Sequence, residues 1–124
     1  MTTRPNAEVV RAIYDSFNRR DLDGYMAAFS EDSIWREMAT GTVYEGPEGQ
    51  RSNYAATVEN VPDSRCGDVA VYSCNDVVVV EFTGTGTTEF GADVRIEFCD
   101  VHTVRGGLIA ATRRYGDPSS AIDN

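Results

Sequence analysis

The sequence is poor in residues that would support metal or redox chemistry. It has three cysteines, Cys66, Cys74 and Cys99, and no pair of them has the C-x-x-C spacing of a zinc or redox motif. His102 is the only histidine, which excludes a site built from several histidines. These absences predict a protein that works without a metal or another cofactor.

Long apolar runs are also missing. No stretch approaches the roughly 20 apolar residues of a membrane-spanning helix, and no apolar segment follows Arg4, as it would in a signal peptide. Basic residues are scarce, with 11 Lys and Arg against 20 Asp and Glu, so the formal net charge is -9. Such a charge repels nucleic acid and anionic membrane surfaces. We therefore expect neither as a partner, and we expect a cytoplasmic protein with reduced thiols.

The composition is otherwise that of a folded domain. Of the 124 residues, 41% are hydrophobic, which allows a core without disulfides or a metal and argues against disorder. No linker, repeat or low-complexity segment interrupts the chain. We expect one domain over residues 1–124.

Three segments predict helices. The first repeats apolar residues at helical spacing over Val9–Phe17, and Thr3 or Asn6 can cap it. Asp21 is a good N-cap for a shorter second helix, whose apolar stripe is Leu22, Tyr25, Met26 and Phe29. Pro47 begins the third helix, because proline suits a first turn.

The remaining segments alternate in the manner of strands. A strand is expected over Ser33–Met38, after a turn at Ser30–Asp32. Consecutive strands joined by short turns, and hence antiparallel, are expected at Arg65–Ser73, Val77–Thr88, Asp93–Val104 and Leu108–Tyr115. The predicted fold is α+β, in the order α-α-β-α-β-β-β-β, with three N-terminal helices packed on one curved, mostly antiparallel sheet.

The apolar face of the predicted strand Asp93–Val104 contains two polar residues. This face includes Phe98 and should point at the helices, yet it carries Asp100 and His102 in its middle. A carboxylate there must find a partner, raise its pKa or line a wet cavity. Either Asp100 is a pocket acid, or the two side chains satisfy each other or a buried backbone group. We favour the first interpretation for Asp100 and the second for His102.

Glu37 is a second candidate acid–base group. Alternation places it on the same face as Trp35, and the tryptophan indicates that this face is partly covered. A glutamate near an apolar wall has a raised pKa and can take or give a proton near neutral pH. The alternative is a solvated glutamate paired with Arg36 or Arg51.

Tyrosine and arginine side chains complete the candidates. Tyr14 and Tyr54 lie on or beside helical stripes, where a hydroxyl can donate to a substrate oxygen or belong to the core. Arg113 and Arg114 end the last strand and point to opposite faces, so one can reach the pocket, and a solvated position is the alternative. The segment Thr83–Thr88 is rich in glycine but lacks the lysine of a phosphate-binding loop, so we expect its glycines to bend the sheet.

These segments resemble a known family. The similarity is carried by Val9–Asn18, by Asp21–Asp32, by Gly46, Tyr54 and Pro62-Asp63 in the third helix, and by the hairpin Cys99–Ile109. Together they resemble the SnoaL-like proteins of the NTF2-like superfamily, which include ketosteroid isomerase-like and polyketide cyclase-like proteins. The resemblance implies a cone-shaped fold with a pocket for a small hydrophobic organic ligand. It also implies a homodimer through the outer face of the sheet, which includes Val101.

The resemblance further implies roles for individual residues. Compared with ketosteroid isomerases, Glu37 falls at the proton-shuttling carboxylate and Asp100 at a protonated acid of the oxyanion hole. Tyr54 falls on a pocket tyrosine, whereas the principal oxyanion tyrosine falls on Ile13, one residue before Tyr14. The chain therefore departs from the isomerase pattern at the oxyanion hole.

We predict an enzyme that isomerises, cyclises or dehydrates a small hydrophobic carbonyl compound of secondary metabolism. Glu37 would move the proton, and Asp100 would hydrogen-bond the developing oxyanion or share the acid–base work. The residues expected to bind the substrate are Tyr14, Trp35, Tyr54, Phe98, His102 and Arg114. The alternative is a protein of the same fold that binds a ligand without chemistry or acts as a dimerising accessory subunit.

Overall fold

The computed structural model describes residues 4–117 and 122–123. Its helices are α1 (Asn6–Asn18), α2 (Leu22–Ala27) and α3 (Gly46–Asn60). Its strands are β1 (Phe29–Glu37), β2 (Val43–Glu45), β3 (Arg65–Cys74), β4 (Val77–Thr87), β5 (Asp93–Arg105), β6 (Leu108–Gly116) and β7 (Ile122–Asp123). The predicted α+β fold and its order of elements are confirmed, and the short strands β2 and β7 are additions to it.

The first two helices begin in different ways, since a side chain caps α2 but not α1. The carboxylate of Asp21 accepts a hydrogen bond from the Gly24 amide at 3.0 Å, so Asp21 caps α2 as predicted. No side chain caps α1, which begins after Pro5. Asn6 was wrongly predicted as its cap, because Asn6 is already the first helical residue. Thr3, the other predicted cap, lies outside the described residues.

Strand β1 is longer than predicted. The turn expected at Ser30–Asp32 is absent, because β1 begins at Phe29 and pairs there with Ile109 of β6. The register shifts between Phe29 and Ile34, which marks a bulge. The polar, turn-like composition of this stretch therefore reflects an irregular strand.

The strands form one sheet in the order β2-β1-β6-β5-β4-β3, and β7 pairs with β5. Strands β3 to β6 are antiparallel neighbours, as their short connections require. The tight turns use residues with positive φ, which are Asn75 (56°), Gly106 (58°) and Gly107 (80°). β1 instead pairs with β6 in parallel, which brings an early segment of the chain beside a late one.

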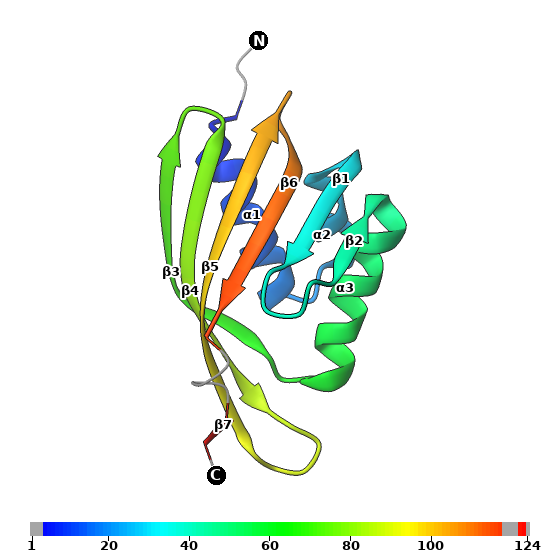
Figure 1. Ribbon diagram of the computed structural model, residues 1–124, viewed down its shortest axis with the longest axis vertical. Coiled ribbons are helices and arrows are strands. Elements are labelled where there is room, and N and C mark those ends of the chain that lie inside the picture. Colours follow the sequence, from blue (N-terminus) through cyan, green and yellow to red (C-terminus); the bar gives the residue numbers. More distant parts are fainter. Residues whose placement is uncertain (1–3, 118–121, 124) are drawn as a thin grey trace.

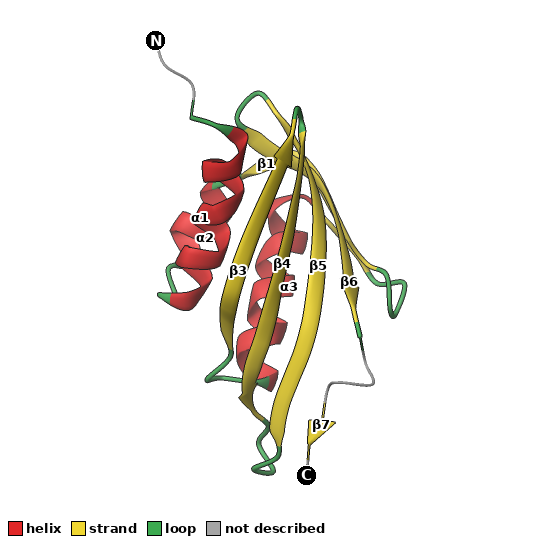
Figure 2. Cartoon of the chain, turned by 90° about the vertical axis from the view of Figure 1, so that its left-hand side faces the viewer, coloured by secondary structure: helices red, strands yellow, loops and turns green. Residues whose placement is uncertain are grey.

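The sheet curves around the helices. Figures 1 and 2 show α1, α2 and α3 on its concave side, and no helix of the described residues covers the opposite face. The core between the layers includes Val10 and Ile13 of α1 and Val78, Val80 and Ile109 of the sheet, each at most 2% exposed. Burying one such side chain contributes about 1.5–3 kcal/mol.

Side chains at and just after the end of α1 form hydrogen bonds with the start of β3 and the segment before it. Asn18 Nδ2 donates to the carbonyl of Cys66 at 2.9 Å, and Asn18 Oδ1 accepts from the Cys66 amide at 2.8 Å. The Arg20 guanidinium donates to the carbonyls of Pro62 at 2.8 Å and Ser64 at 2.6 Å. Arg20 has a φ of 57°, a left-handed conformation that is uncommon without glycine. These bonds fix the β3 edge of the sheet against the helices.

Replacing Asn18 with Ala should lower the free energy of unfolding by about 1–3 kcal/mol, because two backbone groups of Cys66 lose their partner. Asn60→Ala is the matched control, since Asn60 also ends a helix but is exposed. Urea unfolding followed by circular dichroism measures both variants. Equal unfolding midpoints would contradict the fastening role of Asn18.

Candidate active site

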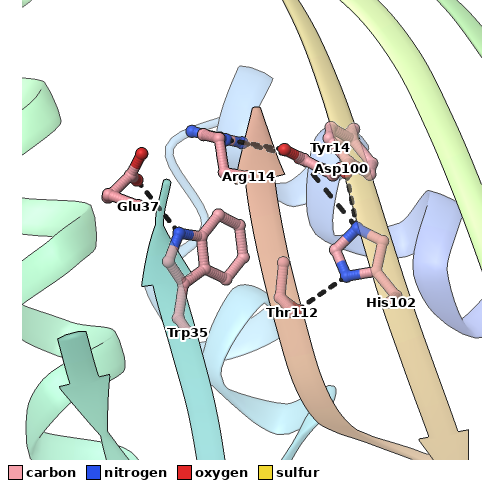
Figure 3. Close-up of polar contacts among 7 residues, drawn as sticks. All are labelled: Tyr14, Trp35, Glu37, Asp100, His102, Thr112 and Arg114. Carbon is pink, nitrogen blue, oxygen red and sulfur yellow. Dashed lines mark hydrogen bonds and ion pairs between the residues drawn. The ribbon is translucent and has the colours of Figure 1, made fainter. Parts of the chain in front are cut away.

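The register of the sheet brings three charged side chains into one row. Arg114 of β6 pairs with Glu37 of the parallel strand β1 and with Asp100 of the antiparallel strand β5. Residues paired in register point to the same face, and here this is the face that the helices cover. Figure 3 shows the Arg114 guanidinium between the two carboxylates. The adjacent row, two residues along each strand, consists of Trp35, Thr112 and His102.

A cavity of about 220 Å³ lies between this face and the helices. Glu37 and Arg114 line it, whereas Asp100 and His102 lie behind its wall and do not. For His102, a direct part in ligand binding is therefore not supported. The other lining residues, mostly aromatic, are Ile13, Tyr14, Phe17, Tyr25, Trp35, Asn53, Tyr54, Thr57, Arg65, Cys66, Phe82, Gly84 and Phe98.

Asp100 and Arg114 form a buried ion pair. The guanidinium donates from Nε to Oδ1 and from Nη2 to Oδ2, both at 2.8 Å, which is bidentate geometry. Burial by itself raises the pKa of the fully buried Asp100. The charge and hydrogen bonds of Arg114 outweigh this effect, so the pKa of Asp100 lies below its usual value. Asp100 is therefore an ionised hydrogen-bond acceptor.

This ion pair corrects two expectations. Asp100 does not fit the role of donor to an oxyanion, because an ionised carboxylate has no proton to donate. The solvated position considered for Arg114 is also wrong, since its side chain is 16% exposed. The guanidinium carbon lies 4.7 Å from the ring centres of Trp35 and Phe98 and 5.2 Å from that of Phe82. Aromatic rings thus cover the faces of the guanidinium and favour its charge.

Tyr14 and His102 extend the ion pair into a hydrogen-bonded chain. Tyr14 donates its only hydroxyl proton to Asp100 Oδ2 at 2.6 Å, so His102 Nε2 must be the donor in its contact of 2.7 Å with the Tyr14 oxygen. Thr112 Oγ1 then donates to His102 Nδ1 at 2.8 Å. Burial lowers the pKa of His102 to about 4, against the opposing effect of Asp100. His102 is thus a neutral, fully bonded core residue. Its hydrogen-bond partners are the hydroxyls of Tyr14 and Thr112, not Asp100 or a backbone group as the sequence suggested.

Glu37 faces the cavity with its carboxylate only partly engaged. Oε1 accepts a hydrogen bond from Trp35 Nε1 at 3.0 Å, and the side chain is partly exposed. Among the described residues, neither Arg36 nor Arg51 forms the ion pair that was considered as the alternative. A carboxylate anchored on one side and open to a cavity on the other can accept a proton from a bound molecule.

Sequence reasoning missed two buried polar residues of the helical wall. Tyr25 of α2 and Asn53 of α3 are each 6% exposed, and both line the cavity. Tyr25 belongs to the apolar stripe of α2, so the pattern indicated a core residue. Burial raises its pKa well above the usual value, which keeps the phenol protonated. Asn53 follows no pattern, and its position next to Tyr54 was the only available signal.

The described residues provide neither a metal cluster nor a reactive thiol in the cavity. Within residues 4–117 and 122–123, no three His, Cys, Asp or Glu side chains are grouped to hold a metal ion. Burial raises the pKa of the Cys66 thiol to about 11, so this cavity residue is protonated at neutral pH. In the same part of the chain, no helix has the length and apolar character needed to span a membrane.

The fold and the cavity define a class of protein. A curved sheet around helices, with a cavity between the layers, is the NTF2-like architecture, and solved structures of this type superpose on the chain. The family model of the SnoaL-like domain matches residues 10–112. The chain belongs to the SnoaL-like domain family, as the resemblance implied. No curated protein sequence matches it.

Solved structures of the same fold have low sequence identity to the chain. A protein from Pseudomonas putida, provisionally assigned as a polyketide cyclase, has a TM-score of 0.84 at 21% identity, covering 97% of this chain and 96% of that chain. TerC, co-crystallised with polyporic acid, has a TM-score of 0.83 at 24% identity, covering 94% of each. A protein with a ketosteroid isomerase-like fold from Catenulispora acidiphila, in complex with trimethylamine, has a TM-score of 0.82 at 21% identity, covering 96% and 90%. Such identities establish the fold alone.

The neutral, buried His102 predicts how stability depends on pH. Its pKa is about 4 in the folded protein against 6.5 ordinarily, so the unfolded chain binds more protons between these values. The free energy of unfolding should be level above pH 6.5 and fall by about 3 kcal/mol as the pH decreases toward 4. Urea unfolding across this range measures the slope.

An NMR titration isolates the contribution of this ring, because His102 is the only histidine. Its ring protons should shift with a midpoint near pH 4, and a midpoint near 6.5 would contradict the buried hydrogen-bonded chain.

Proposed function

We propose that the chain is a cofactor-independent acid–base catalyst that isomerises, cyclises or dehydrates a small hydrophobic carbonyl compound. The row of Glu37, Arg114 and Asp100 carries this proposal, because it places a proton acceptor beside a fixed positive charge at the wall of a largely aromatic cavity. Enolisation needs these two groups, a base for the proton and a donor for the oxyanion.

Glu37 takes a proton from the carbon next to the substrate carbonyl. The electrons of that C–H bond form the enolate double bond, and the carbonyl π electrons move onto oxygen. Arg114 donates to this oxygen, since Asp100 occupies only two of its five N–H groups. In an isomerisation, Glu37 returns the proton to another carbon. In a cyclisation, the enolate carbon attacks a second carbonyl of the substrate, and the new alkoxide takes the proton.

Asp100 acts on Arg114 rather than on the substrate. Its bidentate hydrogen bonds fix the plane of the guanidinium, and Tyr14 and His102 hold the carboxylate in turn. Trp35 and Phe98 cover the faces of the guanidinium, so a ligand can bind only to the N–H groups that Asp100 leaves free. Arg114 thus takes the oxyanion-binding role that the sequence suggested for Asp100.

The similar structures support a small organic ligand in this cavity. TerC was crystallised with polyporic acid and the Catenulispora protein with trimethylamine. Several neighbours are provisionally assigned as polyketide cyclases, including one from Xanthomonas campestris. We extend these properties to the chain and place its substrate in secondary metabolism.

Proton exchange tests the proposal without knowledge of the natural substrate. The protein is incubated in D2O with one- and two-ring ketones such as 1-indanone and 2-tetralone, and loss of the protons next to the carbonyl is followed by NMR. We expect exchange faster than in buffer, and Glu37→Gln should slow it by about 10²–10⁴-fold. Glu31→Gln, an exposed change on the same strand, should leave the rate unchanged.

Two outcomes would contradict the proposal. Equal exchange rates for the wild type and Glu37→Gln would remove Glu37 as the base. Ketone binding without any exchange would instead favour the non-catalytic binding protein, because the cavity would then hold its ligand without moving a proton.

We also propose that the chain forms a homodimer through the outer face of the sheet. The register places Tyr72, Val79 and Val101 side by side on this face, with Arg113 beyond Val101, and no helix of the described residues covers it. Tyr72 of β3 is 56% exposed, and Tyr115, on β6 of the same face, is 43% exposed. Pairing two copies would remove this apolar surface from water.

A charge at the centre of the outer face should separate the copies. Val101→Lys should convert a dimer into a monomer in analytical ultracentrifugation, because a second copy would bring the same charge against it. Ser52→Lys adds the same charge at an exposed position of α3 and should remain dimeric. A monomeric wild type at micromolar concentration, or a dimeric Val101→Lys variant, would contradict the assignment.

We further propose that the protein is located in the cytoplasm. The free cysteines Cys66, Cys74 and Cys99 favour a reducing cytoplasm. Fractionation of the source cells would test this, and recovery of the protein outside the cytoplasmic fraction would contradict it.

A further inference from the structure

The two walls of the cavity differ in how their polar groups are bonded. On the sheet side, Arg114 is held by Asp100, and Glu37 accepts a hydrogen bond from the neighbouring indole. On the helical side, the Asn53 carboxamide and the Tyr25 hydroxyl have no hydrogen-bond partner among the described residues. Both residues are more than nine-tenths buried, so these groups reach solvent only through the cavity.

An apolar ligand would leave these groups without partners. Covering a polar group without replacing its hydrogen bonds to water costs about 1–3 kcal/mol. A site built around such groups rejects ligands that lack the matching function far more strongly than it rejects a change in apolar size. Asn53 and Tyr25 therefore select for a polar group on the part of the ligand that faces α2 and α3.

We infer that the substrate carries two oxygen functions, one bound by Arg114 on the sheet side and a second bound by Asn53 and Tyr25 on the helical side. The inference rests on the proposed function for the first oxygen, whereas the second follows from the unpartnered groups. A carboxamide and a protonated phenol are uncharged and can each donate and accept, so a neutral hydroxyl or carbonyl matches them.

The volume of the cavity indicates the size of the part of the substrate that lies between its walls. An apolar cavity of about 150 Å³ holds a benzene molecule, and drug-sized ligands need about 300–1,000 Å³. A cavity of about 220 Å³ lies between these values and suits one or two rings. The substrate class is therefore a ring compound with two separate oxygen functions, such as a dihydroxyarene or a cyclic diketone.

Calorimetry with naphthols tests the inference. The probes are 2-naphthol, with one hydroxyl, and the 1,5-, 2,6- and 2,7-dihydroxynaphthalenes, which place the second hydroxyl differently. The best diol should bind the wild-type protein about tenfold more tightly than 2-naphthol, as one added hydrogen bond predicts. Asn53→Leu should reduce this ratio to about twofold or less, while the affinity for 2-naphthol is kept, because leucine fills a similar volume without polar atoms.

Two further variants make the test independent of folding defects. Asn60→Leu, the same change at an exposed position of α3, should keep the wild-type ratio. Tyr25→Phe removes one hydroxyl and keeps the ring, and it should lower the ratio as well. If 2-naphthol binds as tightly as every diol, or if both cavity variants keep the wild-type ratio, the inference is wrong.

The failure of this inference is separate from a failure of the proposed function. Proton exchange that depends on Glu37, together with no preference for diols, would leave the catalyst and remove the second oxygen site. A preference for diols that depends on Asn53, together with no proton exchange, would leave the site as part of a binding protein.

Discussion

The buried ion pair between Asp100 and Arg114 is the interaction on which the site depends. Either charge alone at this depth would cost several kcal/mol, so each residue requires the other. The two hydrogen bonds of the bidentate pair satisfy both groups, and the carboxylate accepts a third hydrogen bond from the Tyr14 hydroxyl. Buried pairs of this kind often add little to stability when compared with apolar residues. What this pair provides is an arginine with one position and one charge state at the wall of a cavity.

The polar groups around that arginine form two layers with different properties. Behind the wall of the cavity, the side chains of Thr112, His102 and Asp100 all have hydrogen-bond partners. This layer is therefore rigid, and the protonation state of each side chain in it is fixed. Inside the cavity, the Glu37 carboxylate can accept further hydrogen bonds. On the helical wall, the Asn53 carboxamide and the Tyr25 hydroxyl can be hydrogen-bonded only by water or a ligand. For the proposed function, this division makes the pocket selective, because the preorganised groups hold the reacting centre and the unpartnered groups favour ligands that can hydrogen-bond to them.

Much of this arrangement could be predicted from residue patterns, and its limits have physical causes. Strict alternation predicted that Asp100 and His102 point inward and that Trp35 shares a face with Glu37. The parallel pairing of β1 with β6 was beyond local patterns, since it joins distant segments. That pairing places Glu37 beside Arg114. The charge of Asp100 depends instead on the register of the predicted β5–β6 hairpin, which alternation alone did not provide. Tyr25 and Asn53 were missed because helical periodicity separates buried from exposed positions and does not separate core from cavity.

The parallel pairing of β1 with β6 also has a consequence for when the site comes into existence. Glu37 lies in the first third of the chain and Arg114 near its end, and the sheet alone places them side by side. Contacts between segments so distant in sequence form late, because a long loop must close before they contribute. On the ribosome, the helices and β1 emerge long before their partner strand is synthesised. The row of Glu37, Arg114 and Asp100 is thus one of the last parts of the molecule to form, and a chain that has folded only partly carries Glu37 without its arginine.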